Sequence, residues 1–289
     1  MQETTTWNHE FVEANGLRFH CVTQGEGDLV LLLHGFPESW YSWRHQIPYL
    51  ARRFKVVAPD LRGYGESDKP EGVGEYKADK LVNDVRCLIE AFGASRAHVV
   101  SHDWGGVVAW MFAVAFPSHL DKLVVMNAPH PAVFAKNLMS NPRQMMRSWY
   151  TFFFQLPRIP ELLFSAHDFY LLKYFFSEWA IDKEAFSKED LKELARAAGR
   201  PGALTGGINY YRASMRNLGF FKMARSFPRI LSPTLLIWAE SDRALGKELT
   251  YGLDPYFADG LRIRYIPRCS HWVQQEAPNI VNQYLDEFL

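Results

Sequence analysis

The strongest chemical signal in the chain is an aspartate between an apolar strand and an apolar helix. The strand pattern of residues 97–101 leads into SHDWGG (101–106), and an apolar run then continues to Phe116. A sharp strand-to-helix turn closed by glycines exposes its central side chain above a sheet, which is the geometry of a nucleophile elbow. Asp103 occupies that centre. An aspartate at a helix start is often only an N-cap, so the assignment needs further support.

Three other segments supply that support. HGFPE (34–38) follows the apolar strand 29–33, so its backbone N–H groups can face the elbow as an oxyanion hole. Asp242 comes just after a late apolar strand, and His271 follows the last one. The chain order of nucleophile, acid and histidine is that of the α/β-hydrolase triad.

The elements that must position these residues alternate along the chain. Two strands within Glu10–Gln24 are joined at Asn15-Gly16, a pair that favours a type I′ hairpin turn. Amphipathic or apolar helices are predicted over Tyr76–Phe92 and Trp104–Phe116. Short apolar runs, typical of strands buried on both faces of a parallel sheet, cover Leu29–Leu33, Lys55–Ala58, Ala97–Val100, Lys122–Met126, Thr234–Ala239 and Leu261–Ile266. The pattern predicts an α/β domain.

The alternation stops after Asn127 and resumes near Pro233. Within this interval the segment 131–224 has a helical pattern and contains 18 of the 43 aromatic side chains. Its helices are interrupted by four prolines, at positions 142, 157, 160 and 201. We therefore expect a hydrolase core formed by residues 1–130 and 225–289, with residues 131–224 inserted as a helical cap, or lid.

The sequence resembles an epoxide hydrolase of the α/β-hydrolase fold. The resemblance covers essentially the whole chain and is carried by HGFPESWYSWR (34–44), DLRGYGESDKP (60–70), SHDWGG (101–106), SWYTFFFQLP (148–157), GGINYYRA (206–213) and CSHW (269–272). It implies an eight-stranded, mostly parallel sheet under a helical lid. It also implies that two lid tyrosines, Tyr150 and Tyr211, bind the epoxide oxygen. Ser101 and Ser270 depart from the family pattern, because each stands where glycine is usual; both are small, so we expect the turns to form.

These residue types suit the opening of an epoxide. A carboxylate is already ionised at neutral pH, so Asp103 can attack carbon without first losing a proton. The phenols of Tyr150 and Tyr211 can protonate the alkoxide as it develops. His271, oriented by Asp242, can then activate the water that hydrolyses the ester. The backbone N–H groups of Phe36 and Trp104 would hold the oxyanion, and we expect Phe36, Trp104, Tyr150 and Tyr211 to contact the substrate. No metal or organic cofactor is required.

Other polar residues have structural interpretations. Spacing alone does not separate Tyr210 from Tyr211, and the resemblance favours Tyr211. We expect His34 and His102 to support the two catalytic turns. Glu38 and Arg44 should form local polar contacts, and Asp60 and Asp68 should support loops beneath the site.

Two other functions use the same fold. A haloalkane dehalogenase shares the aspartate and histidine but holds its halide with N–H donors, typically Trp104 and a side chain at position 36. Phe36 offers no such donor, and both lid tyrosines match. A non-catalytic receptor would bind a small molecule in the same cavity; the joint presence of Asp103, Asp242, His271 and both tyrosines disfavours it.

Composition restricts the partners. The chain has 289 residues with 32 cationic and 32 acidic side chains, a balance that argues against nucleic acid or an anionic membrane as the main partner. Three widely spaced cysteines and the lack of a signal-like or spanning apolar segment indicate a cytoplasmic protein. We expect a small hydrophobic epoxide as substrate and a monomer or homodimer.

Overall fold

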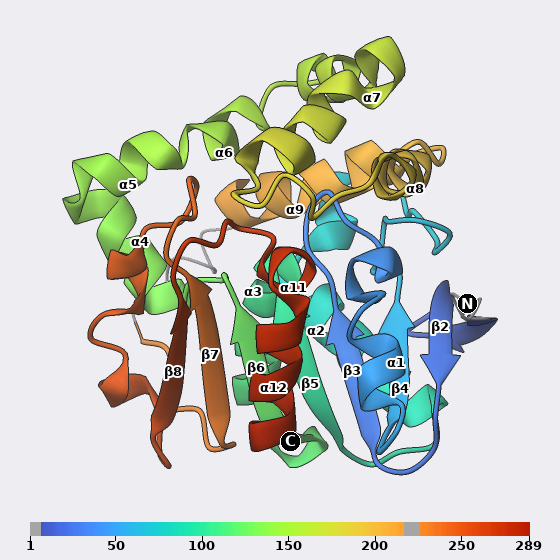
Figure 1. Cartoon of the computed structure of the whole chain (residues 1–289), viewed down its shortest axis with the longest axis vertical. Helices are drawn as coiled ribbons and strands as arrows, with labels where there is room; N and C mark the ends of the chain where they lie inside the picture. Colours follow the sequence, from blue (N-terminus) through green and yellow to red (C-terminus); the bar gives the residue numbers. More distant parts are fainter. Residues whose placement is uncertain (1–6, 217–225) are drawn as a thin grey trace.

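The computed structural model describes residues 7–216 and 226–289. Its centre is an eight-stranded sheet in the order β1-β2-β4-β3-β5-β6-β7-β8 (Figure 1). The strands are β1 Asn8–Ala14, β2 Leu17–Gln24, β3 Leu29–Leu33, β4 Lys55–Pro59, β5 Ala97–His102, β6 Leu120–Met126, β7 Thr234–Ala239 and β8 Leu261–Ile266. β2 is antiparallel to both β1 and β4, and the remaining pairs are parallel. The predicted α/β fold and eight-stranded, mostly parallel sheet are confirmed.

Helices cover both faces of the sheet. The α-helices are α1 Ile47–Leu50, α2 Ala78–Ala91, α3 Asp103–Ala115, α4 Pro131–Ser140, α5 Pro142–Arg147, α6 Trp149–Phe153, α7 Ile159–Trp179, α8 Lys188–Ala198, α9 Ala203–Arg216, α11 Val273–Glu276 and α12 Pro278–Phe288. Short 3₁₀ helices lie at η1 Trp40–Trp43, η2 Val73–Tyr76, η3 Pro117–His119, η4 Lys247–Thr250 and η5 Asp254–Tyr256. None of the described helices is long and apolar enough to cross a membrane.

Strand β3 shows why the central strands are apolar throughout. Leu29, Leu31 and Leu33 belong to the core on the side of α2 and α3, whereas Val30 and Leu32 belong to the core on the side of α1 and α12. Successive side chains of a strand point to opposite faces, so a strand with helices on both faces needs apolar residues at every position.

Helices α4 to α9, which we call the cap helices, lie between β6 and β7 in the chain and above one end of the sheet (Figure 1). Two of the prolines expected to interrupt this segment stand in the first turns of helices, Pro142 in α5 and Pro160 in α7. Proline is tolerated there because the N–H it lacks has no partner within the helix. Residues 217–224, which the sequence assigns to the cap, lie outside the described residues.

The predicted helix over Tyr76–Phe92 begins later than expected. Tyr76 belongs to η2, and the extended backbone of Lys77 (φ −69°, ψ 152°) separates it from α2. Asp79 and Lys80, three and four residues after Tyr76, are both charged, so the apolar period itself starts only at Leu81.

Candidate active site

Asp103 stands at a strained turn between β5 and α3. Its φ is +47°, in the left-handed region that non-glycine residues rarely adopt. The turn is crowded: a Cβ added to Gly35 would lie 2.4 Å from the Asp103 Cβ, and one added to Gly105 would lie 2.2 Å from the Leu33 carbonyl oxygen. The glycines of both motifs therefore let β3 and β5 bring their ends together. Ser101 is accommodated here because its hydroxyl donates to the Val124 carbonyl at 2.9 Å.

The Asp103 carboxylate has two different neighbours. The Phe36 backbone N–H donates to Oδ1 at 2.8 Å, and the His271 Nε2 lies 3.5 Å from Oδ2. Burial alone would raise the pKa of Asp103, but the hydrogen bond and charge of His271 outweigh it and hold the pKa below its ordinary value. The group is thus ionised at neutral pH, as a carboxylate nucleophile must be. The Trp104 N–H lies in the first turn of α3, where amides have no partner within the helix.

Asp242 orients His271. The His271 Nδ1 lies 2.7 Å from Asp242 Oδ2, while Oδ1 accepts the backbone N–H groups of Ala244 and Leu245 at 2.8 and 3.0 Å. Asn127 donates its side-chain amide to Oδ2 at 2.8 Å. Burial opposes ionisation of Asp242, but His271 and these donors lower its pKa.

Asn127 was not among the site residues predicted from the sequence. Its place just after β6 (Leu120–Met126) is a signal that could have found it, because the carboxyl ends of parallel strands meet at one edge of a sheet.

His271 is held between two carboxylates. Burial lowers its pKa, but Asp242 and Asp103 together raise it well above the ordinary value. Beneath it, His102 Nε2 lies 2.9 Å from the His271 carbonyl oxygen, and its Nδ1 lies 2.8 Å from Glu38. His102 therefore supports the catalytic turn from below and makes no contact with Asp103 oxygens among the interactions of the described residues.

Glu38 has more partners than the sequence indicated. Its fully buried carboxylate accepts the Gly35 N–H at 2.9 Å, but it also binds His102 and the side-chain amides of Gln274 and Gln275 at 2.9 and 2.8 Å. The predicted local contact, with Gly35, is present, but three further partners come from β5 and α11. Glu38 joins the loops that carry Phe36, Asp103 and His271.

His34 fixes the loop after β3. The Leu61 N–H donates to its Nε2 at 3.0 Å, so the ring proton is on Nδ1, which donates to the Gly35 carbonyl oxygen at 2.9 Å. Both ring nitrogens are thus used in holding backbone, as the sequence interpretation proposed.

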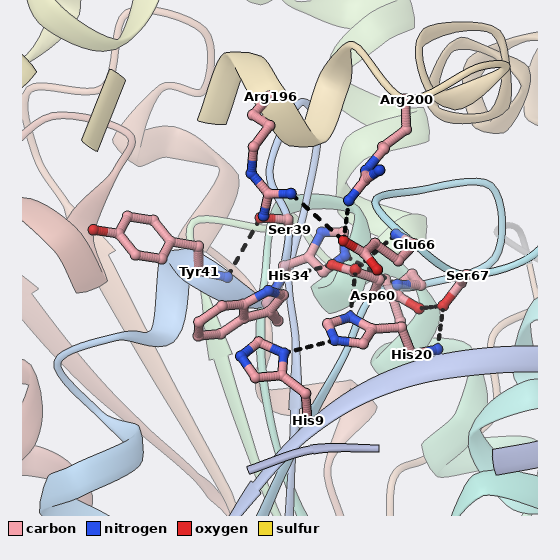
Figure 2. Close-up of polar contacts among 12 residues, drawn as sticks. His9, His20, His34, Ser39, Tyr41, Asp60, Glu66, Ser67, Arg196 and Arg200 are labelled. Atoms are coloured by element: carbon pink, nitrogen blue, oxygen red, sulfur yellow. Dashed lines mark hydrogen bonds and ion pairs between the residues drawn. The ribbon is translucent and has the colours of Figure 1, made fainter. Parts of the chain in front are cut away.

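Asp60 anchors the loop that follows β4 (Figure 2). Its carboxylate accepts the backbone N–H groups of Trp40 and Glu66 at 3.0 and 2.9 Å, and His20 Nδ1 lies 2.8 Å away. His9 extends the cluster, with its Nδ1 2.9 Å from His20 Nε2. The buried aspartate thereby ties η1, β2 and the 60–68 loop together beneath the cap helices. Asp68 has the smaller role of accepting the Arg18 N–H at 2.8 Å.

The two expected tyrosines come from different cap helices and meet above Asp103. Tyr150 (α6) and Tyr211 (α9) have ring centroids 5.9 Å apart and line the same cavities as Asp103. Burial and the nearby Asp103 charge raise the pKa of both phenols, which keeps them protonated. Tyr210 instead donates its hydroxyl to the Arg62 carbonyl at 2.9 Å. The structure therefore separates the two adjacent tyrosines, which spacing could not do.

Close backbone approach sets the position of α9. A Cβ added to Gly206 would lie 2.3 Å from the Gly63 carbonyl oxygen, and one added to Gly207 would lie 2.8 Å from the Phe36 ring. Only glycine fits such an approach. The Gly-Gly pair thus lets α9 rest directly on the core loops and places Tyr211 one helical turn further along.

The cavity has two lobes that share Asp103, Tyr150 and Tyr211. The smaller, of about 80 Å³, reaches toward Phe134, Leu138 and Met215. The larger, of about 270 Å³, also contains His271 and is walled by aromatic rings: Trp149, Phe153, Phe154, Phe164, Phe175, Trp179 and Trp272. Much of the aromatic surplus of the sequence therefore faces a cavity, which is suited to an apolar molecule.

Polar contacts join the cap helices to the catalytic loops. Arg44 makes the expected local contact with the Tyr41 carbonyl, but it also pairs with Asp190 of α8 at 2.9 Å and donates to Gln275 at 2.6 Å. The buried Gln144 of α5 donates to the Ala244 carbonyl at 2.9 Å and accepts the Gly246 N–H at 3.0 Å. No feature of the local sequence signals these long-range pairings, because their members are 100 or more residues apart.

A third connection passes through Glu276. Its Oε2 accepts the Ser270 hydroxyl and N–H, and its Oε1 accepts the N–H groups of Ile181 and Asp182 at 3.1 and 3.2 Å. The departure from glycine at position 270 therefore adds a hydrogen bond beside His271. Within residues 7–216 and 226–289 no cluster of three His, Cys, Asp or Glu side chains is arranged as a metal site.

Comparisons with known proteins agree with this geometry. A family model described as the alpha/beta hydrolase fold matches residues 28–278, and fold and site together define the chain as an α/β hydrolase. Epoxide hydrolase 4 of Mus musculus is 41% identical over 96% of this chain and 78% of its own. Epoxide hydrolase 3 of Xenopus tropicalis is 42% identical over 95% and 75%. The crystal structure of the Bacillus megaterium epoxide hydrolase with an inhibitor superposes with a TM-score of 0.90, at 31% identity over 96% of this chain and 99% of that one. The chain belongs to the epoxide hydrolases of the α/β-hydrolase fold.

Proposed function

We propose that this protein hydrolyses an epoxide to a vicinal diol through a covalent ester on Asp103. The observation that carries the proposal is the convergence of an ionised aspartate and two buried, protonated phenols in one apolar cavity. The relatives named as epoxide hydrolases support it.

In the first step, Asp103 Oδ2 attacks a ring carbon. Oδ1 is engaged by the Phe36 N–H at 2.8 Å, whereas Oδ2 has only the longer contact of 3.5 Å with His271 Nε2 and is the oxygen that attacks. The C–O bond of the ring breaks, and the electron pair remains on the ring oxygen. Tyr150 or Tyr211 gives its proton to that oxygen, so the product is an aspartyl ester with a neighbouring hydroxyl.

In the second step, water hydrolyses the ester. His271 takes a proton from water as the oxygen attacks the Asp103 carbonyl carbon, and Asp242 stabilises the imidazolium. The Phe36 and Trp104 N–H groups hold the oxyanion, whose collapse breaks the bond between the Asp103 carbonyl carbon and the ester oxygen. The departing alkoxide takes the second proton of the water, so the diol leaves and the Asp103 carboxylate returns. The His271 proton returns through solvent to the tyrosinate, which closes the cycle.

The two steps are linked by charge. In the free enzyme, Asp242 and Asp103 both raise the pKa of His271. Once Asp103 is an ester its negative charge is gone, so one of those causes disappears and the pKa of His271 falls. Once Asp103 has formed the ester, a larger fraction of His271 is therefore neutral and able to accept a proton from water.

Intact-protein mass spectrometry of His271→Gln tests the scheme. With a panel of aryl and alkyl epoxides, the variant should accumulate an adduct of protein plus epoxide, because ester formation continues while hydrolysis is slowed. The double variant Asp103→Asn/His271→Gln is the matched control and should remain unmodified. Absence of both adduct and diol across the panel would refute the proposal. Faster halide release from haloalkanes than diol formation would favour the dehalogenase alternative.

Three broader assignments belong to the same proposal. Residues 131–224 act as a cap on a core of residues 1–130 and 225–289, with the polar contacts of Arg44, Gln144 and Glu276 as support. The protein works in the cytoplasm, as its three widely spaced free cysteines suggest. It acts on a small hydrophobic epoxide, as a monomer or homodimer, and the chemistry uses no metal or organic cofactor.

A further inference from the structure

The outer side of the cap carries an unusual number of exposed apolar side chains. α5, α6 and α7 follow the upper edge of Figure 1, on the side of the cap away from the sheet. Eight side chains here, which we call the cap rim, are between 43 and 68% exposed: Met145, Met146, Trp149, Phe152, Leu156, Ile159, Leu162 and Leu163. Exposed apolar side chains gathered on consecutive helices mark interaction sites more often than isolated ones do.

The spacing shows that the exposure belongs to an outward helical face. In α6, Trp149 and Phe152 are three residues apart while Thr151 between them is buried. In α7, Ile159, Leu162 and Leu163 follow the 3.6 period, whereas Pro160 and Phe164 are buried. A surface helix normally places polar residues on its outward face. Helix α6 and the first turn of α7 therefore expose apolar side chains as well as burying them, whereas the rest of α7 also exposes polar residues such as Asp168 and Glu178.

Two residues of the cap rim also line the cavity. Trp149 and Leu163 are 55 and 48% exposed, yet both also line the larger lobe that contains Asp103 and His271. An apolar path therefore runs from the outer surface of the cap to the nucleophile.

Charge identifies the kind of partner. Residues 136–165 contain four cationic side chains, Lys136, Arg143, Arg147 and Arg158, and one acidic side chain, Glu161. Glu161 pairs with Arg212 at 2.6 Å. In the described parts of the chain, Lys136, Arg143 and Arg158 form no ion pair, so the apolar rim carries unneutralised positive charge.

We infer that the cap rim docks on the surface of an anionic phospholipid bilayer. Apolar and tryptophan side chains enter the headgroup region, while arginines meet the lipid phosphates. A second copy of the chain fits less well, because a two-fold interface would bring the same cations face to face. The charge balance of the whole chain argued against a membrane partner, because it does not show that cationic side chains outnumber acidic ones in residues 136–165.

Docking would give the enzyme direct access to its substrate. An apolar epoxide partitions into a bilayer, and the rim would place the cavity mouth against it. This delivery rests on the proposed function, but the docking itself does not, so the test measures binding and catalysis separately.

Vesicle flotation tests the docking. The whole protein is mixed with phosphatidylcholine vesicles, either pure or containing about one third phosphatidylglycerol. We expect it to float with the anionic vesicles, and the bound fraction to fall at high salt and with the pure phosphatidylcholine vesicles. Phe152→Ser/Leu162→Ser should weaken partitioning about tenfold or more. Leu231→Ser/Tyr251→Ser is the matched control. It removes apolar side chains of similar exposure that lie outside the cap helices, and we expect no change in binding.

A second pair isolates the charge contribution. Arg143→Gln/Arg158→Gln should reduce binding to anionic vesicles severalfold. Arg52→Gln/Lys77→Gln removes two exposed cations that lie outside the cap helices and should not reduce this binding. All four variants should hydrolyse a water-soluble epoxide at the parent rate, because none of these residues lines the lobes around Asp103.

Three results would overturn the inference: no flotation of the parent protein, equal loss in the control variants, or light scattering that shows a dimer dissolved by Phe152→Ser/Leu162→Ser. Failure of epoxide hydrolysis with intact flotation would reject the proposed function and leave the docking standing.

Discussion

The floor and the roof of the active-site cavity are built by different means. On the floor, the charges of Asp103, Asp242 and His271 are fixed by hydrogen bonds at 2.7 to 3.0 Å, several of them from backbone N–H groups. On the roof, Tyr150 and Tyr211 are placed by ring packing, 5.9 Å from each other and with Tyr211 4.9 Å from Trp104.

The difference follows from what each side must hold. Floor groups carry charge in an interior where an unpaired charge is costly, so each needs dedicated partners. The roof must supply neutral donors, and a phenol is already neutral at pH 7; burial and the nearby Asp103 charge raise its pKa further. Removing a roof hydroxyl should therefore affect ring opening, and removing a floor partner should affect ester hydrolysis.

The largest effect should come from the roof. Tyr150→Phe/Tyr211→Phe should slow ester formation by about 10²- to 10⁴-fold, because the leaving alkoxide loses its proton donors. Single-turnover adduct formation measured by mass spectrometry checks this. Tyr210→Phe is the matched control: it removes the neighbouring hydroxyl, which bonds the Arg62 carbonyl, and should leave ring opening intact. Undiminished adduct formation in the double variant would disprove the tyrosine assignment.

On the floor, Asn127→Ala should act on the second step. It removes one charge-assisted hydrogen bond to Asp242, worth about 1.5–3 kcal/mol, so ester hydrolysis should slow by about 10- to 100-fold while ester formation changes little. Rapid-quench measurement of ester decay distinguishes the steps. Asn137→Ala, which removes a bond to the Val133 carbonyl and a bond from the Asn141 side-chain amide, neither of which involves Asp242, provides the comparison. Equal slowing of both steps would mean that Asn127 shapes the whole site.

The charge coupling across the floor predicts a change with pH. Because the pKa of His271 is raised in the folded state, its charged form contributes stability that is fully present below about 6.5, its unfolded value. That stability is lost as the pH rises through the raised folded value. Asp103→Asn removes one raising charge, so the loss should move to lower pH. NMR titration of His271 and unfolding free energy against pH measure the shift; an unmoved pKa would show that Asp242 alone sets it.

The smallest effect concerns the attachment of the roof. Asp190→Asn weakens the ion pair with Arg44 and should cost about 1–2 kcal/mol, lowering Tm by about 2–4 °C for each kcal/mol. Glu189→Gln, on the same turn of α8 but paired only with the exposed Lys192 at 3.8 Å, should change Tm by less than about 1 °C. Thermal unfolding compares the two. Similar Tm values would show that packing, and not this pair, attaches α8.

The floor residues could be predicted from the sequence, whereas the contacts of the cap helices could not. Asp103, Asp242 and His271 could be placed from sequence because each follows an apolar strand, and parallel strands bring such positions to one edge. Arg44–Asp190 and Gln144–Ala244 could not, since helix packing on the cap determines which distant side chains meet. Only the orientation of α9 about its axis shows which of Tyr210 and Tyr211 faces the cavity. The cap rim could not be predicted from the composition, because composition does not show where apolar side chains lie on the surface.

The contact between Gly206 and Gly63 has a consequence for how this architecture can be recombined. The two backbones touch where any side chain would intrude, so the cap and the core loop form a matched pair contributed by distant parts of the chain. A chimera that takes its lid from one family member and its core from another would seat the lid only where both parents carry glycine at this junction. The cavity-lining residues of the cap helices can therefore vary between relatives, provided that the two glycines at this contact are kept.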